Sequence, residues 1–160
     1  MNEAAAKLLR YGGDILPSAG MQQERGYIQH GAFSCYDHSV RVAYMSLWLA
    51  ARLPGRVDER ALVRGALLHD YFLYDWHDPD PGHRRHGFHH ARRALRNACA
   101  DFELGAVERD IIRKHMFPLN FWPPRYRESW IVCLADKLCA TGEVTTMARQ
   151  RLRHLFRCRA

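Results

Sequence analysis

Apolar residues recur at every third or fourth position through most of this chain, which is typical of amphipathic helices. The two clearest stripes lie in residues 36–53 and 57–70. Their members are Val42, Met45 and Leu49 in the first, and Leu62, Ala66 and Leu67 in the second. Asp58 stands where an N-cap would begin the second helix, and Gly65 would let another helix pack closely against it.

Prolines divide the rest of the chain into further blocks, because proline disrupts helix interiors. We expect helices in 89–102, in 105–116 and from about residue 128 onward, separated by an aromatic, histidine-rich loop and a proline-rich loop. The alternation of apolar and polar residues that marks strands is scarce. The sequence therefore predicts an all-α fold of about six or seven helices.

Length and composition agree with one globular domain: the chain has 160 residues, 48% hydrophobic and 26% charged. The N-terminus lacks the features of a secretory signal, and no apolar stretch reaches the roughly 18 residues that span a bilayer. The five cysteines are odd in number and show no CxxC pair, so we expect reduced thiols and a cytoplasmic protein without membrane attachment.

The net charge of +7 favours anionic partners such as phosphorylated metabolites, nucleotides or nucleic acid. Part of this charge lies in the last twelve residues, on Arg149, Arg151, Arg153, Arg157 and Arg159. These arginines form either the solvated face of a terminal helix or an arm that binds nucleic acid or a membrane surface. The charge alone does not choose a partner.

Imidazole and carboxylate side chains interrupt or end the apolar stripes of four predicted helices. His38 lies near the start of one, His69 and Asp70 close the next about 100° apart around its axis, and His115 ends a third. Asp136 lies within an apolar stripe, where burial is unfavourable unless a cation or strong donors hold the carboxylate. It is either a ligand or a buried partner for an arginine or a backbone cap. Imidazole and carboxylate together suit iron, manganese, zinc or nickel.

The order of these residues resembles the HD-domain superfamily of helical metal-dependent phosphohydrolases. The motifs that carry the resemblance are YDHSVRVA, ALLHD, DIIRKH and LADKLCA, and the longer strings HDYFLYDWH and HGFHHARRAL resemble a small bacterial subgroup of single-domain HD proteins. The resemblance implies one HD domain over residues 1–160. Its core would be 35–141, with an N-terminal segment 1–34 and a basic C-terminal helix 144–160.

The resemblance also implies a ligand set. His38, His69, Asp70 and Asp136 would hold one divalent metal ion, and Asp70 would bridge to a second ion bound by His115 and one more histidine. The candidates for that histidine are His83, His86, His89 and His90, of which His90 is the first choice and His86 the second. Iron and manganese are the expected metals, with zinc, nickel or magnesium as alternatives.

The expected activity is hydrolysis of a phosphoester of a small phosphorylated compound, with a nucleotide as the favoured substrate. Asp70 would position the attacking water, and Asp75 would be an acid or base. The candidate phosphate-binding cations are Arg41, Lys114, Arg125 and Lys137. Leu73 replaces a lysine found in many binuclear phosphodiesterases of the superfamily, and Met116 replaces a second histidine found in those that cleave cyclic dinucleotides. Both differences weigh against cyclic dinucleotides.

Two other functions remain open from the sequence. Mixed-valent di-iron oxygenases with the HD fold have the same order of ligands, and a nucleotide or nucleic-acid binding module could hold a purely structural metal. Five aromatic side chains could stack on a base or pack between helices: Tyr71, Phe72, Trp76, Phe117 and Trp122. The sequence does not determine the oligomeric state.

Overall fold

The computed structural model describes residues 3–30, 33–76 and 86–157, with side chains described up to residue 146 except those of His30, His86 and Phe88. The described elements are α1 (Glu3–Gly12), α2 (Ala19–Gln23), the 3-10 helix η1 (Glu24–Gly26), β1 (Ile28–His30), β2 (Phe33–Ser34), α3 (Cys35–Ala50), α4 (Glu59–Leu68), α5 (His86–Asp101), α6 (Ala106–Lys114) and α7 (Arg127–Arg157). Seven α-helices in these ranges confirm the all-α prediction.

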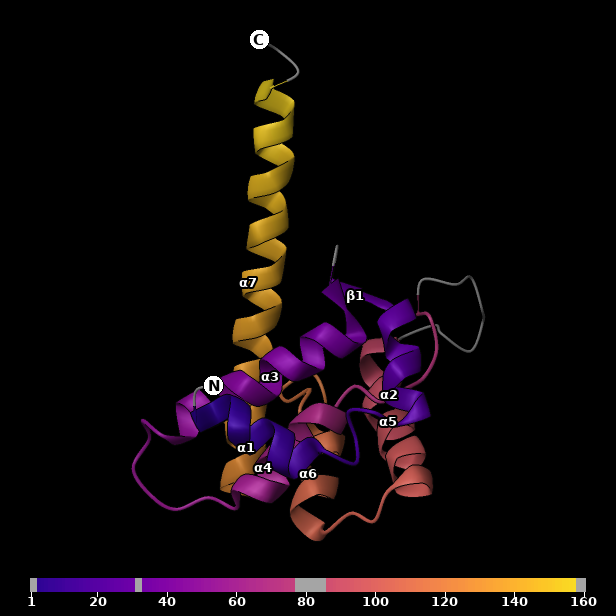
Figure 1. Ribbon diagram of the computed structural model, residues 1–160, viewed down its shortest axis with the longest axis vertical. Coiled ribbons are helices and arrows are strands. Elements are labelled where there is room, and N and C mark those ends of the chain that lie inside the picture. The colour runs from indigo at the N-terminus through magenta and orange to yellow at the C-terminus, as the bar shows by residue number, and fades with distance from the viewer. Residues whose placement is uncertain (1–2, 31–32, 77–85, 158–160) are drawn as a thin grey trace.

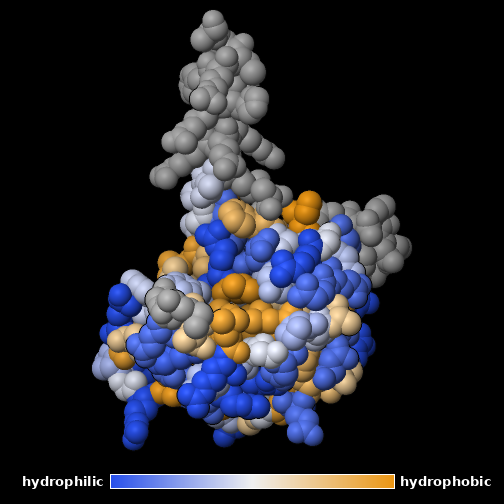
Figure 2. All heavy atoms as spheres, viewed as in Figure 1, coloured by the Kyte–Doolittle hydropathy of each residue, from blue (hydrophilic) through white to orange (hydrophobic). Residues whose placement is uncertain are grey.

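The centre of the fold is α4, which packs against both α3 and α6, while α7 packs across the same two helices. Every residue of α4 from Ala61 to Leu68 is buried. A helix that is buried on all sides must be surrounded by others, and here α1 and α5 complete the cover. Figure 1 shows these helices gathered in one body. On the surface seen from the same side, hydrophobic atoms gather near the middle and hydrophilic residues surround them (Figure 2).

Two expectations about α4 are confirmed. The carboxylate of Asp58 accepts a hydrogen bond from the backbone N–H of Ala61 at 2.9 Å, as an N-cap does. A Cβ atom at Gly65 would lie 2.5 Å from Cδ1 of Ile111 in α6, so only glycine allows the two helices to approach this closely.

Gly65→Ala should lower the free energy of unfolding by about 1–3 kcal/mol, because the added methyl group overpacks the contact with Ile111. Urea unfolding followed by circular dichroism measures this. The matched control is Gly142→Ala in α7, where the added Cβ would point into open space away from other side chains and elements. There alanine should raise stability by about 0.5–1 kcal/mol through helix propensity. Equal stabilisation at both positions would contradict the packing role of Gly65.

The N-terminal segment contains a hairpin that the sequence pattern does not reveal. β1 and β2 pair antiparallel, with Ile28 opposite Ser34 and His30 opposite Phe33. Strands of three and two residues are too short to display alternation. The hairpin lies directly before α3, and Ser34 caps that helix by accepting from the N–H of Asp37 at 3.1 Å.

Residues 144–157 of the expected C-terminal helix form the outer part of α7, which projects away from the other helices (Figure 1). Residues 158–160 lie outside the described residues. The arginines of 144–160 lie outside the described side chains. None of the described helices is both long and apolar enough to cross a membrane. The cytoplasmic location stays a prediction.

Candidate metal centre

The six side chains expected as ligands meet where five helices come together. They are His38 in α3, His69 and Asp70 at the end of α4, His90 in α5, His115 at the end of α6 and Asp136 in α7. Five of them are buried, and Asp136 exposes 13% of its side chain. Among the described residues they form three overlapping groups of three, and within each group the possible ligand atoms lie within 4.8 Å of one another.

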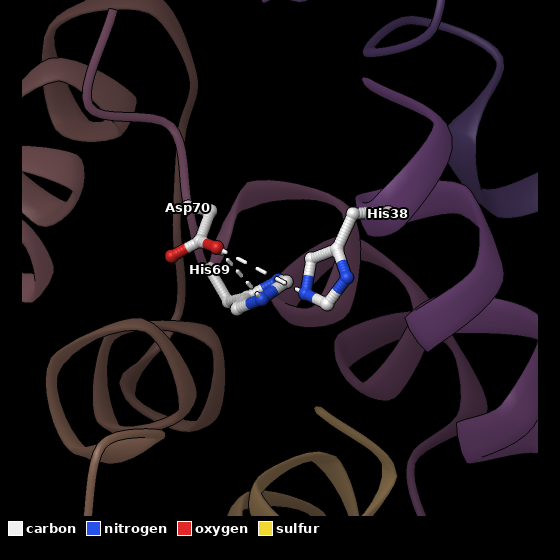
Figure 3. Close-up of side chains that lie close together, drawn as sticks. All are labelled: His38, His69 and Asp70. Atoms are coloured by element: carbon white, nitrogen blue, oxygen red, sulfur yellow. Dashed lines mark ion pairs between the residues drawn. The ribbon is translucent and has the colours of Figure 1, made fainter. Parts of the chain in front are cut away.

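Asp70 stands between two pairs of histidines. Its Oδ2 lies 3.4 Å from Nε2 of His69 and 4.0 Å from Nε2 of His38. Its Oδ1 lies 3.2 Å from Nε2 of His90 and 3.4 Å from Nε2 of His115. Figure 3 shows the first pair: His38 projects from α3 toward Asp70, with the His69 ring beside it. Each carboxylate oxygen therefore faces its own pair of ring nitrogens.

Asp136 lies closest to His38 and His69, the pair that faces Oδ2 of Asp70, and it also forms one of the three ligand groups with His69 and His115. Its Oδ1 lies 3.1 Å from Nε2 of His38 and 3.8 Å from Nε2 of His69. Asp70 and Asp136 thus place two carboxylates around the same pair of imidazoles. Two histidines and two carboxylates form a set of hard and borderline donors that divalent transition metals favour.

Backbone carbonyls orient two of the rings. Nδ1 of His69 lies 2.7 Å from the carbonyl oxygen of Ala66, and Nδ1 of His115 lies 2.9 Å from that of Ile112. When Nδ1 carries the proton and donates it to the carbonyl, Nε2 presents a lone pair to Asp70 and its surroundings. Metal-binding histidines are oriented in this manner in many proteins.

The turn after the His69–Asp70 pair is held by α5. Nδ2 of Asn97 donates to the carbonyl oxygens of Tyr71 and Phe72 at 3.2 and 3.0 Å, and the Tyr71 hydroxyl donates to Asp101 at 2.8 Å. Leu73 adopts a positive φ of 58°, which is uncommon outside glycine. These contacts fix the end of α4 relative to α5, and so fix Asp70 relative to His90.

The polar atoms of the cluster fit a cation. Nε2 of His69 and Oδ1 of Asp70 are fully buried, yet neither has a hydrogen bond of proper geometry among the described residues. Buried polar atoms without partners are unfavourable. Because nitrogen lone pairs and carboxylate oxygens converge here, a metal ion would satisfy both atoms.

The pKa values in the cluster show the same demand for positive charge. Burial alone would lower the pKa of His38, but hydrogen bonds to Asp136 and Glu143 raise it to about 10. Burial opposes ionisation of Asp70 as well, yet the charge of His69 and the contacts with His115 and His90 hold the pKa of that carboxyl well below its usual value. The Asp70 carboxyl therefore favours its ionised form, and the carboxylates around His38 favour a positive charge on that ring.

Three residues near the cluster were missed by sequence reasoning. Glu143 is fully buried in α7, and Nδ1 of His38 donates to its Oε2 at 3.1 Å. It lies seven residues after Asp136, two helical turns along the same face, so the spacing could have revealed it. Gln29 donates from Nε2 to Oδ2 of Asp70 at 2.6 Å, and no sequence signal marks it because it lies in the short hairpin. The third, Glu24, is also buried, and burial followed by repulsion from Asp70 raises its pKa well above the usual value.

The four predicted phosphate-binding cations differ in how close they lie to the cluster. Nε of Arg41 is 3.5 Å from Oε1 of Glu143, on the His38 side of the cluster. Lys137 donates from Nζ to the carbonyl oxygen of His115 at 3.1 Å. Lys114 pairs with Asp110 at 2.8 Å, and Arg125, which is exposed, lies over the ring of Tyr126. Arg41 and Lys137 are therefore nearest to the ligands.

The other predicted site residues are only partly described. Asp75 is half-buried in the segment after α4 and is not a member of the three ligand groups. Its charge contributes to raising the pKa of the Cys35 thiol, after burial and the charges of Asp70 and Glu24. α5 begins at His86, three residues before the helix expected over 89–102, so His90 lies in its second turn. The side chain of His86 and all of His83 lie outside the described residues.

Comparison with curated proteins and with solved structures gives no match. The family model of the HD domain matches residues 35–141, a span that includes all six residues of the cluster. This span is more than half of the 160 residues, and the chain therefore belongs to the HD domain family.

Proposed function

We propose that the protein is a binuclear metal-dependent phosphohydrolase that acts on a small phosphorylated compound, with a nucleotide as the favoured substrate. The observation that carries this proposal is the position of Asp70 between two pairs of histidines. Family membership supports metal-dependent hydrolysis in general. The arrangement around Asp70 supports two ions.

His38, His69 and Asp136 would hold one ion and His90 and His115 the other, with one oxygen of Asp70 for each. When bound, two divalent ions supply Lewis acidity and lower the pKa of a water molecule, which is the chemistry that phosphoester hydrolysis needs. Iron or manganese are the proposed ions, because carboxylate and imidazole together suit both.

The other residues would support these ligands. The carboxylate of Glu143 fixes the ring orientation of His38, and Gln29 holds Oδ2 of Asp70 by a hydrogen bond. Arg41 exposes 45% of its side chain beside Glu143 and would bind a phosphate oxygen at the rim of the cluster. Asp75 is proposed to exchange a proton with the leaving group, which the Asp75→Asn variant would test through its pH–rate profile.

Metal content and product release test the proposal together. The protein should be purified without chelator or added metal, its metals quantified by plasma mass spectrometry, and phosphate release measured with nucleotides and with p-nitrophenyl phosphate. We expect two ions per chain and hydrolysis that manganese or iron restores after metal removal. A mixed-valence electron resonance signal with substrate-dependent oxygen uptake, and no phosphate release, would instead identify an oxygenase.

A further inference from the structure

The outer faces of α5 and α6 carry a basic surface that the proposed hydrolase does not use. Arg92, Arg93 and Arg96 follow His89 at intervals of three, four and seven residues, so these four side chains share one face of α5. The neighbouring His90 is buried and points toward Asp70. α5 thus separates the metal cluster on its inner side from a row of cations on its outer side.

Two adjoining hollows border this row and meet at Arg92. One, of about 330 Å³, lies between the arginines of α5 and Tyr74. The other, of about 310 Å³, lies between Arg92, the end of α6 and the segment 119–122. We call the two together the basic surface. Each hollow alone is the size of a small ligand, and the pair offers room for a longer one.

The charge of the basic surface is largely uncompensated. Among the described residues no acidic side chain lines either hollow. The arginines of α5 and Arg113 of α6 form no ion pair with a described carboxylate. Of the lysines and arginines that line the hollows, only Lys114 has such a partner in the described part of the chain, Asp110 at 2.8 Å. The surface therefore favours an anion with several charges.

Two aromatic side chains stand at one end of the basic surface. Phe121 is 84% exposed and Trp122 is 72% exposed, and their rings meet edge to face with centroids 6.0 Å apart. Other aromatics that could have stacked on a base serve packing instead: Tyr71 and Phe72 are buried, and Phe117 contacts Trp130. Exposed neighbouring aromatic rings contribute nothing to the core of the protein, and they offer faces on which planar groups can stack.

We propose that the basic surface binds single-stranded nucleic acid, with phosphates along Arg92, Arg93, Arg96 and Arg113 and bases stacked on Phe121 and Trp122. A row of cations combined with exposed aromatic rings is the chemistry that recognises a flexible strand whose bases are free to stack. An acidic peptide would use the cations and leave the rings without a partner. A duplex would keep its bases stacked on each other and would make no use of the rings.

This proposal is independent of the hydrolase proposal, because no residue of the basic surface is a proposed metal ligand. Its test measures binding and not turnover. The full-length protein is titrated into a fluorescein-labelled strand of twelve thymidines, and fluorescence anisotropy gives the dissociation constant at several salt concentrations. The strand is recovered and its length checked, so that any hydrolysis is seen separately from binding.

The double variant Phe121→Ala with Trp122→Ala should weaken binding at least ten-fold, because two stacking partners are removed. Arg92→Glu should also weaken binding, and the slope of log K against log salt should fall in magnitude by about 0.7 for each phosphate that the protein no longer neutralises. The matched controls are Trp48→Ala and Arg52→Glu. These residues form a cation–π pair at the C-terminal end of α3, with the guanidinium of Arg52 3.9 Å from the centroid of the Trp48 ring. Both control variants should bind with an affinity within about two-fold of the wild type.

Three results would overturn the proposal. The first is no binding of the strand at low salt. The second is unchanged affinity in the double aromatic variant, which would assign binding to other arginines of the chain, such as those of the last twelve residues. The third is equal competition by inorganic polyphosphate in the wild type and in the double variant, which would reduce the surface to a general anion site. Because Phe121 and Trp122 are exposed, their replacement leaves the core intact, and thermal unfolding checks this.

Discussion

Asp70→Asn should yield a folded protein that retains less than about a tenth of its metal and has no measurable hydrolysis. Among the described side chains, Asp70 is the one whose two oxygens face both pairs of histidines. Asparagine has nearly the same shape and can keep the hydrogen bond from Gln29, but it removes the negative charge that would balance two cations. Replacing this one side chain should therefore remove both of the proposed ions.

Metal content, circular dichroism and phosphate release measure the three parts of this prediction. The matched control is Glu103→Gln, which removes one carboxylate charge at an exposed position between α5 and α6. It should keep the metal and the activity of the wild type. If Asp70→Asn kept its full metal content and turnover, the proposed metal centre would be wrong. If it failed to fold, the carboxylate would have a structural role that goes beyond ligation.

The sequence predicts the fold well where apolar periodicity is long. α4 and α6 lie where the stripes place them, and the N-cap Asp58 and the glycine contact at Gly65 follow from local rules of helix ends and packing. The resemblance to HD domains adds the prediction of which histidines and aspartates along the chain would be metal ligands. The structure brings them together because each occupies the buried side or the inner end of its helix, which is a position that periodicity can identify.

Other parts of the site depend on contacts between segments that are distant in the sequence. Gln29 reaches Asp70 through a hairpin too short to display alternation, and the separation of the two residues is 41 positions. The exposure of Phe121 and Trp122 could not be predicted from the sequence either, because it depends on whether another helix covers these side chains. Glu143 is the exception, since its spacing from Asp136 already places both on one face of α7.

His115→Ala should reduce the metal content from two ions per chain to one and lower the rate of hydrolysis by at least about a hundred-fold. Nε2 of His115 lies 3.4 Å from Oδ1 of Asp70, which His90 also faces. The rings of His38 and His69 face the other oxygen, and Asp136 lies against these two rings. The first ion would therefore keep its ligands. Removing a ligand of the second ion removes its Lewis acidity, which the proposed reaction requires.

Plasma mass spectrometry and phosphate release test this prediction, and His90→Ala should give the same result. The matched control is His89→Ala, because His89 is adjacent to His90 on α5 but exposed, and its variant should keep two ions. Retention of two ions in both His90→Ala and His115→Ala would mean that these histidines do not bind metal. Loss of both ions in either variant would mean that the two positions do not form separate sites, and the division of ligands around Asp70 would have to be abandoned.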